Sequence, residues 1–240
     1  GIKGVFRVLS AAIMILEPEQ VPAADFLTWM THVRSTYSYT RQGAIRTVRE
    51  LAREVTRNGG EVWTRAEVKR ILLEGRRARG VLVEREGREV TALAPVIVSS
   101  IGPRKTARLV GYENLPPDYV ARLEAKEEAK VHIEVYIESD EPLLETTSIV
   151  LPVGTRRVCI LLDPTPIVEW GPKGKHLTSA DSVAQSPDLT GEAEEVLKEL
   201  DEVLPGWRQR GRLLMLTTLR GDEWGFISTS QMEPLETPIP

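Results

Sequence analysis

The alternation of apolar and polar residues is clearest between Gly43 and Val110, where it predicts a helix followed by short strands. Apolar side chains recur every three or four residues from 44 to 55, the spacing of an amphipathic helix that buries one face. Residues 58–60 are Asn-Gly-Gly, and glycine readily adopts the left-handed conformation found at helix C-termini. The helix is therefore predicted to end there and to lead into a sheet.

Extended segments follow this glycine turn. They are predicted at 61–63, 68–73, 80–83, 90–93 and 95–100. Glycine turns separate the middle ones, as in an antiparallel meander. The last segment, Pro-Val-Ile-Val-Ser-Ser, is apolar on both faces, which is typical of a strand buried in a parallel sheet.

The two flanks have different patterns. Residues 1–40 read as helices, interrupted by Pro18 and Pro22. In residues 111–240, a short helix from about 117 to 125 precedes a strand at 131–137 with alternating polarity. A helix is predicted from 189 and ends at Pro205. The remaining strands are predicted at 147–151, 157–162, 176–183 and 212–220. This succession predicts an α+β domain with a mostly antiparallel sheet.

Composition describes an ordinary globular protein and excludes several function classes. The chain has 240 residues, 41% hydrophobic and 28% charged, with a formal net charge of −4. Such a mixed, slightly acidic charge does not favour nucleic-acid binding. The single cysteine, Cys159, excludes an internal disulfide and suits a reducing, cytoplasmic setting. The three histidines show no ligand spacing, so no metal site is predicted. No apolar run is long enough to span a membrane.

Several short motifs, in this order, resemble those of one enzyme group. They are Gln-Gly-Ala-Ile at 42–45, Gly-Gly-Glu-Val at 59–62, Glu-Val-Lys-Arg-Ile at 67–71, Gly-Val at 80–81 and Ala-Pro-Val-Ile-Val-Ser-Ser at 94–100. The order and spacing resemble the middle of phytoene-desaturase-like FAD-dependent oxidoreductases, which are related to the flavin amine oxidases. Leu-Pro-Gly-Trp at 204–207 and Thr-Pro-Ile-Pro at 237–240 resemble later segments of the same group.

The resemblance implies a fold class between α+β and α/β, namely the central part of a two-domain FAD-dependent oxidoreductase. Residues 1–40 would belong to a helical lid of the substrate domain. Residues 41–110 would form part of the FAD-binding domain, and 111–240 the antiparallel-sheet substrate domain. An apolar, polyene-like substrate is implied between the sheet and the lid.

The resemblance also implies cofactor-binding residues. By position, the backbone of Val68 would hydrogen-bond the adenine of FAD. Ser99 and Ser100 would end a strand that runs toward the cofactor, and Gly43 would belong to a glycine pair in which Gln42 replaces the other member. No catalytic residue is predicted, because the flavin itself carries the hydride transfer.

The sequence departs from the group at both phosphate-binding motifs. No GxGxxG motif occurs, and the chain ends at Pro240, where the last flavin-contacting motif would begin. We therefore expect the central portion of a longer protein, or a subunit whose partner supplies the nucleotide-binding segments. By itself the chain is expected to bind FAD poorly.

Other interpretations of the same residues remain open. The scaffold could be a non-catalytic binding module that holds an apolar ligand or a partner chain. Val68 could be favoured by packing alone, Ser99 and Ser100 could cap the following helix, and His132 reads as a surface or edge residue. Cys159 reads as a small core residue. The apolar N-terminal helix adds the hypothesis of peripheral membrane contact.

Overall fold

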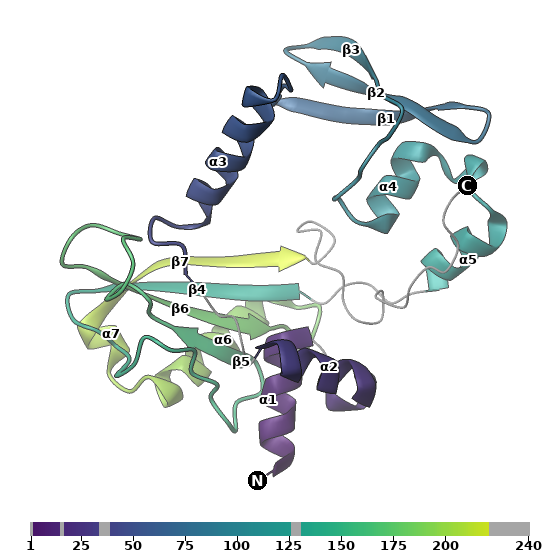
Figure 1. The fold of residues 1–240 in the computed structure, drawn as a ribbon. Helices are drawn as coiled ribbons and strands as arrows, with labels where there is room; N and C mark the ends of the chain where they lie inside the picture. Colours follow the sequence, from purple (N-terminus) through teal and green to yellow (C-terminus); the bar gives the residue numbers. More distant parts are fainter. Residues whose placement is uncertain (1, 15–16, 34–38, 126–130, 221–240) are drawn as a thin grey trace. The chain divides into compact units, whose positions relative to one another are not determined.

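The computed structural model describes residues 2–14, 17–33, 39–125 and 131–220 (Figure 1). Contacts divide the chain into two compact units. The first contains the described residues up to 51 together with 131–220, and the second contains 52–125. The three-part division expected from the sequence stays a prediction, and the motif at 237–240 lies outside the described residues.

A four-stranded antiparallel sheet forms the centre of the first unit. Its strands are β4 (Val131–Ser139), β5 (Val158–Leu162), β6 (His176–Val183) and β7 (Gly211–Arg220), in the order β5-β6-β4-β7. The alternating sequence of β4 thus belongs to an interior strand, and the predicted antiparallel sheet is confirmed. The mixed α/β architecture agrees with the expected fold class.

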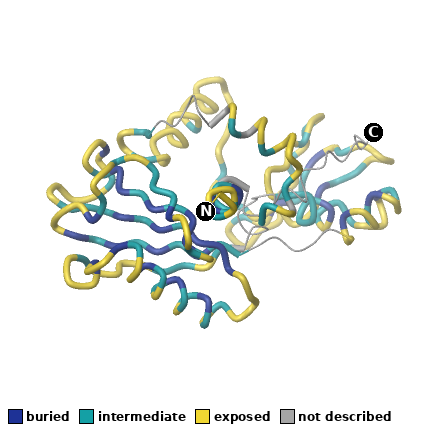
Figure 2. Tube along the Cα trace, turned by 90° about the horizontal axis from the view of Figure 1, so that it is seen from below, coloured by how far each residue is buried: buried dark blue, intermediate teal, exposed yellow. Residues whose placement is uncertain are grey.

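One face of this sheet is the hydrophobic core. Ile133, Val135 and Ile137 of β4 are fully buried, and they pack against Val196 and Leu200. The last two belong to α6 (Leu189–Val203), after which the four-residue helix α7 (Trp207–Arg210) follows. Burial alternates along β4 because successive side chains of a strand point to opposite faces (Figure 2).

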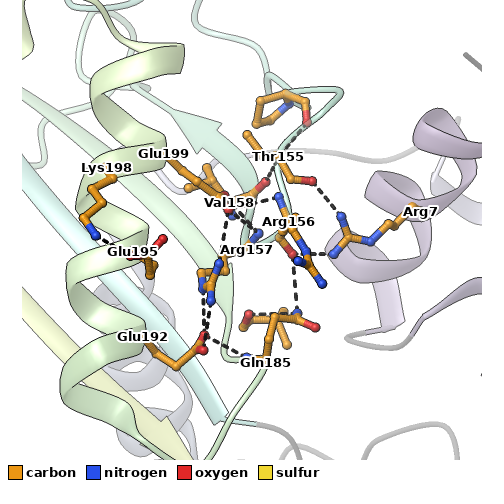
Figure 3. A network of polar contacts seen from close by, with 12 residues as sticks. Arg7, Thr155, Arg156, Arg157, Val158, Gln185, Glu192, Glu195, Lys198 and Glu199 are labelled. Atoms are coloured by element: carbon orange, nitrogen blue, oxygen red, sulfur yellow. Dashed lines mark hydrogen bonds and ion pairs between the residues drawn. The ribbon is translucent and has the colours of Figure 1, made fainter.

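An ionic network joins α6 to the start of β5 (Figure 3). Arg157 donates to Glu192 at 2.8 and 3.0 Å. Glu199 accepts the backbone N–H groups of Arg156, Arg157 and Val158 at 2.9–3.1 Å. The guanidinium neutralises carboxylates that α6 buries, so these polar contacts fix the helix on the sheet.

The N-terminal helices are α1 (Ile2–Met14), the 3-10 helix η1 (Pro18–Gln20) and α2 (Ala23–Val33), as the proline positions predicted. Ala11 and Ala12 of α1 pack against Cys159 and Val183, on the face of the sheet opposite to α6. Within the described chain, no helix is long and apolar enough to cross a membrane.

The second unit is a β-meander with two helices. Strands β1 (Ala66–Glu74), β2 (Arg77–Arg85) and β3 (Arg88–Leu93) pair in sequence order. They are followed by α4 (Pro103–Val110), the 3-10 helix η2 (Tyr112–Asn114) and α5 (Pro117–Ala125). A small core joins the helices through Ala107, Leu115, Tyr119 and Leu123.

The expected buried strand at 95–100 is wrong. These residues form no strand, and Val96 and Val98 are 72% and 88% exposed. An extended segment becomes a strand only when a neighbour accepts and donates its backbone hydrogen bonds, and no described segment does so here. For the same reason 61–63 is not a strand, and the strand expected at 147–151 is reduced to a single bridge between Val150 and Leu161.

The predicted amphipathic helix is present as α3 (Ala44–Arg57), but its expected buried face is not. Ile45, Val48, Leu51 and Val55 are 43–62% exposed. The apolar spacing specified the helix correctly, whereas burial requires a partner surface, which the described residues do not supply.

Candidate functional site

Val68 lies near the start of β1, at the edge of the meander. It pairs with Val83 of β2, and its side chain is 37% exposed. An edge strand leaves every second backbone N–H and C=O group without a ladder partner. Among the described residues β1 pairs with β2 alone, so its outer edge presents backbone donors and acceptors of the kind that can hydrogen-bond a planar base.

Ser99 and Ser100 belong to the same unit and are exposed. The Ser99 hydroxyl shares a 2.6 Å hydrogen bond with that of Thr106 in the first turns of α4. The N-cap of α4 is Gly102, with no side-chain cap, so neither serine caps this helix. The alternative of a capping role is thereby removed, and both serines lie just before a helix N-terminus.

Gly43 lies immediately before α3, in the first unit rather than with Val68 and the serines. Its φ of +77° is in the left-handed region, and a Cβ at this position would lie 3.8 Å from the Trp170 indole nitrogen. That nitrogen donates to the carbonyl of Thr40 at 3.0 Å. The positive φ explains a glycine here, since a Cβ 3.8 Å from the indole would be an ordinary contact.

A polar cluster occupies the sheet face opposite to α6. His132, Glu134 and Tyr136 alternate along β4, and Asp181 of β6 is the direct cross-strand partner of Glu134. One ligand atom each of His132, Glu134 and Asp181 lies within 4.8 Å of the others. Tyr136 donates to Glu134 Oε2 at 2.7 Å. Because the pairing register fixes these positions, the cluster is built into the sheet rather than carried on flexible loops.

The electrostatics of this cluster are unusual. Burial, and then the charge of Glu134, raise the pKa of Asp181 to about 6. Burial also lowers the pKa of His132, which favours the neutral imidazole. The pKa of Tyr136 is raised by burial and by its hydrogen bond to Glu134. Each shift opposes the accumulation of charge in this place.

His132 was expected at a surface or edge, and that expectation is wrong. β4 is an interior strand, and the imidazole is half-buried. Strand order is set by long-range pairing, so the sequence of β4 alone could not show it. The available signal was that His132, Glu134 and Tyr136 share one polar face of an alternating strand.

An apolar pocket of about 270 Å³ lies within the N-terminal helices. Apart from Ser10, its walls are apolar. The lining residues are Phe6, Ser10, Pro18, Val21, Ala23, Phe26 and Leu27. Phe6 and Phe26 stand 5.7 Å apart, centroid to centroid, across α1 and α2. The predicted lid segment therefore forms an open hollow suited to an apolar group.

The sheet carries a second polar group at the start of β6. Asp163 is 1% exposed and accepts from the Thr165 backbone N–H at 3.0 Å, and the ring of His176 lies 3.2 Å from its other oxygen. These contacts close the turn after β5. Cys159 is buried, as predicted, and burial raises the pKa of its thiol to about 12, so it is not a reactive thiolate.

No protein-family model matches the chain, and no curated protein matches it either. Several solved structures are similar to it. The chain is 24% identical, with a TM-score of 0.79, to an oxidoreductase from Methanosarcina mazei, over 92% of this chain and 53% of that one. It is 20% identical, with a TM-score of 0.76, to the PF1083 protein from Pyrococcus furiosus, over 90% and 53% of the two chains.

A weaker likeness is to the myxobacterial chondrochloren halogenase CndH, described as a variant of FAD-dependent halogenases. It has a TM-score of 0.49 and 20% identity over 77% of this chain and 41% of that one. A TM-score below 0.5 does not establish a shared fold. The chain thus spans about half the length of the two solved structures that it matches well, and it has the fold of the corresponding part of a solved oxidoreductase.

Proposed function

We propose that this chain is the central part of a flavin-dependent oxidoreductase of the phytoene-desaturase-like type, acting on an apolar, polyene-like substrate. The observation that carries the proposal is the fold shared with an oxidoreductase over nearly the whole chain. The order of motifs between residues 42 and 100 is a second support, which comes from the sequence and not from the fold.

Several features of the second unit are compatible with FAD. The edge strand β1 presents backbone groups near Val68, which suit the adenine. The extended, exposed segment that ends at Ser99 and Ser100 leads into the N-terminus of α4, where backbone N–H groups favour negatively charged ligands. When bound, FAD would accept the hydride, while the protein binds the substrate and excludes water.

Exposed apolar surface supports the proposal that a further segment completes the flavin domain. The apolar side chains of α3 are exposed, and so are Val96 and Val98. Helices with one wholly apolar face are usually packed against something. We propose that a nucleotide-binding segment, from the same protein or from a partner subunit, covers these residues.

The proposed substrate region combines the N-terminal helices with the sheet of the first unit. α1 packs on the sheet face that carries Cys159 and Val183, and the apolar pocket lies between α1, η1 and α2. An apolar group could be held there without hydrogen-bonding partners. The alternative, a non-catalytic module that holds an apolar ligand or a partner chain, uses the same pocket without flavin.

The flavin absorbance spectrum tests the proposal. The 240-residue chain is mixed with excess FAD and desalted, and the whole protein purified from its source is measured beside it. We expect stoichiometric flavin in the whole protein and little in the chain. Replacing Ser99 and Ser100 together by Ala should weaken FAD binding of the whole protein by up to about tenfold for each lost hydrogen bond. A whole protein that never retains flavin would support the binding module instead.

Peripheral membrane contact is a separate part of the proposal. Ile2, Phe6 and Leu27 on α1 and α2 are 47–74% exposed and could insert into a lipid surface. Co-sedimentation with phosphatidylcholine–phosphatidylglycerol vesicles tests it. Wild-type chain should sediment and the Ile2→Ser/Leu27→Ser variant should not, whereas equal recovery of both in the supernatant removes the idea.

A further inference from the structure

The carboxylates of Glu134 and Asp181 face each other across β4 and β6, and no Lys or Arg of the described ranges pairs with them. Like charges directly opposite in an antiparallel pair are destabilising, and both residues are half-buried. Among the residues that the structure describes, neither carboxylate forms an ion pair with Lys or Arg.

Other poorly exposed carboxylates of the same unit are paired with basic side chains. Glu192 and Glu199 are 4% and 13% exposed, and Arg157 bridges both. Glu138, on the same strand and the same face as Glu134, lies 3.2 Å from Arg212 and 3.9 Å from Lys175. Within the described part of the chain, the Glu134–Asp181 pair has no Lys or Arg of the kind that pairs with Glu138, Glu192 and Glu199.

His132 adds a donor of a different kind. It lies two residues before Glu134 on the same face of β4, and burial keeps its imidazole neutral, which is the form that binds metals. The geometry points to a site for one divalent first-row transition-metal ion, such as Zn²⁺ or Mn²⁺, bound by His132, Glu134 and Asp181. This site does not involve the flavin, so it can be tested independently of the proposed function.

The distances suit such an ion after a small movement. Three donor atoms within 4.8 Å of one another all lie within about 2.8 Å of a common point, against about 2.0–2.2 Å for zinc bonds to nitrogen and oxygen. A mixed set of imidazole and carboxylate ligands suits zinc, manganese and iron. Calcium and magnesium prefer sites made of oxygen ligands alone.

Tyr136 fits the role of an outer-sphere partner. Its hydroxyl donates to Glu134 Oε2 at 2.7 Å, which orients the carboxylate and leaves Oε1 for the ion. Metal-bound carboxylates are commonly held in this way. The bound cation would offset the repulsion between the two carboxylates, which is the smaller of the two causes, after burial, that raise the pKa of Asp181.

Metal titration of the 240-residue chain tests the site. The chelator-treated chain is titrated with Co²⁺, followed by its visible absorption, and then with competing Zn²⁺, whose bound amount is measured by elemental analysis after dialysis. We expect one ion per chain. Asp181→Asn and His132→Gln should each lower the affinity by at least ~100-fold, because even outer-sphere partners cost about 10–100-fold. Tyr136→Phe should cost about tenfold.

Two matched controls keep the test specific. Glu138→Gln removes a carboxylate from the same strand and face that already has basic partners, and His176→Gln removes the imidazole beside Asp163. Both should bind the ion as wild type does. Asp181→Asn relieves a repulsion, so it should fold at least as well as wild type, which circular dichroism checks. Absent binding, or equal binding by wild type and Asp181→Asn, overturns the proposal, and the carboxyl pair then shares a proton instead.

Discussion

The two faces of the sheet β5-β6-β4-β7 treat charge in opposite ways. On the α6 face, Glu192 is buried and Glu199 is partly buried, and Arg157 bridges both. On the other face, Glu134 and Asp181 stand opposite each other with no Arg or Lys paired to them among the described residues. The first arrangement stabilises the fold. The second leaves a charge repulsion uncompensated, which is more typical of a binding or catalytic site.

The α6 face should dominate stability. Leu200 is fully buried in the core, and Leu200→Ala removes apolar contacts and leaves a cavity. We expect a loss of about 4 kcal/mol in the free energy of unfolding, measured by urea denaturation. A loss below ~1 kcal/mol would mean that α6 is not fixed on the sheet as Figure 1 shows.

Removing the cation that pairs with Glu192 and Glu199 should lower the free energy of unfolding slightly less than Leu200→Ala does. Arg157→Met keeps much of the side-chain volume but leaves Glu192 and Glu199 without their cation. We expect a loss of about 3 kcal/mol at neutral pH, at the lower end for a buried pair because Arg157 keeps 16% exposure. The surface pair of Arg208 and Asp201 is the control, and Arg208→Met should change stability by no more than ~1 kcal/mol.

Removing the uncompensated charge of Asp181 should raise the stability of the fold instead of lowering it. The folded-state pKa of Asp181 is raised from 3.8 to about 6, so the folded state binds more protons between these values and stability falls as pH rises through this window. At pH 7.5 and without metal, Asp181→Asn should be more stable than wild type by about 1–3 kcal/mol. The two proteins should converge below about pH 4, and curves that stay parallel over this range would contradict the raised pKa.

The smallest effect is expected on α3. Leu51 is 62% exposed, so Leu51→Ala should change the stability of this chain by less than ~0.5 kcal/mol. A larger loss would show that α3 is covered in solution, and gel filtration would then test whether a second copy covers it. The contrast with Leu200→Ala separates a helix that holds the fold from one that offers a surface.

Local pattern predicted much of the fold. The prolines at 18 and 22 separated the first helices, and the alternation at 131–137 specified β4 together with its buried side. These features depend on residues close in sequence. The strand expected at 95–100 failed because strand formation needs a partner, and composition says only that the segment could be buried.

The polar cluster shows the limit more sharply. His132 and Glu134 share one face of β4, which the sequence could show, but Asp181 reaches them only through the register of β6. The flavin contacts at Gly43, Val68, Ser99 and Ser100 rest on resemblance and stay predictions. The roles expected of Gly43 and Val68 lie in the backbone and leave no side-chain signature, so neither spacing nor burial could identify them.

The hydrogen bonds of Glu199 also affect the edge of the sheet. β5 lies at the edge of its sheet, where unpaired N–H groups invite edge-to-edge association with another chain. The Glu199 carboxylate takes up the N–H groups of residues 156–158, so an incoming strand finds these donors occupied and a negative charge beside them. At these three residues a single side chain of α6 therefore disfavours the addition of another strand to the β5 edge.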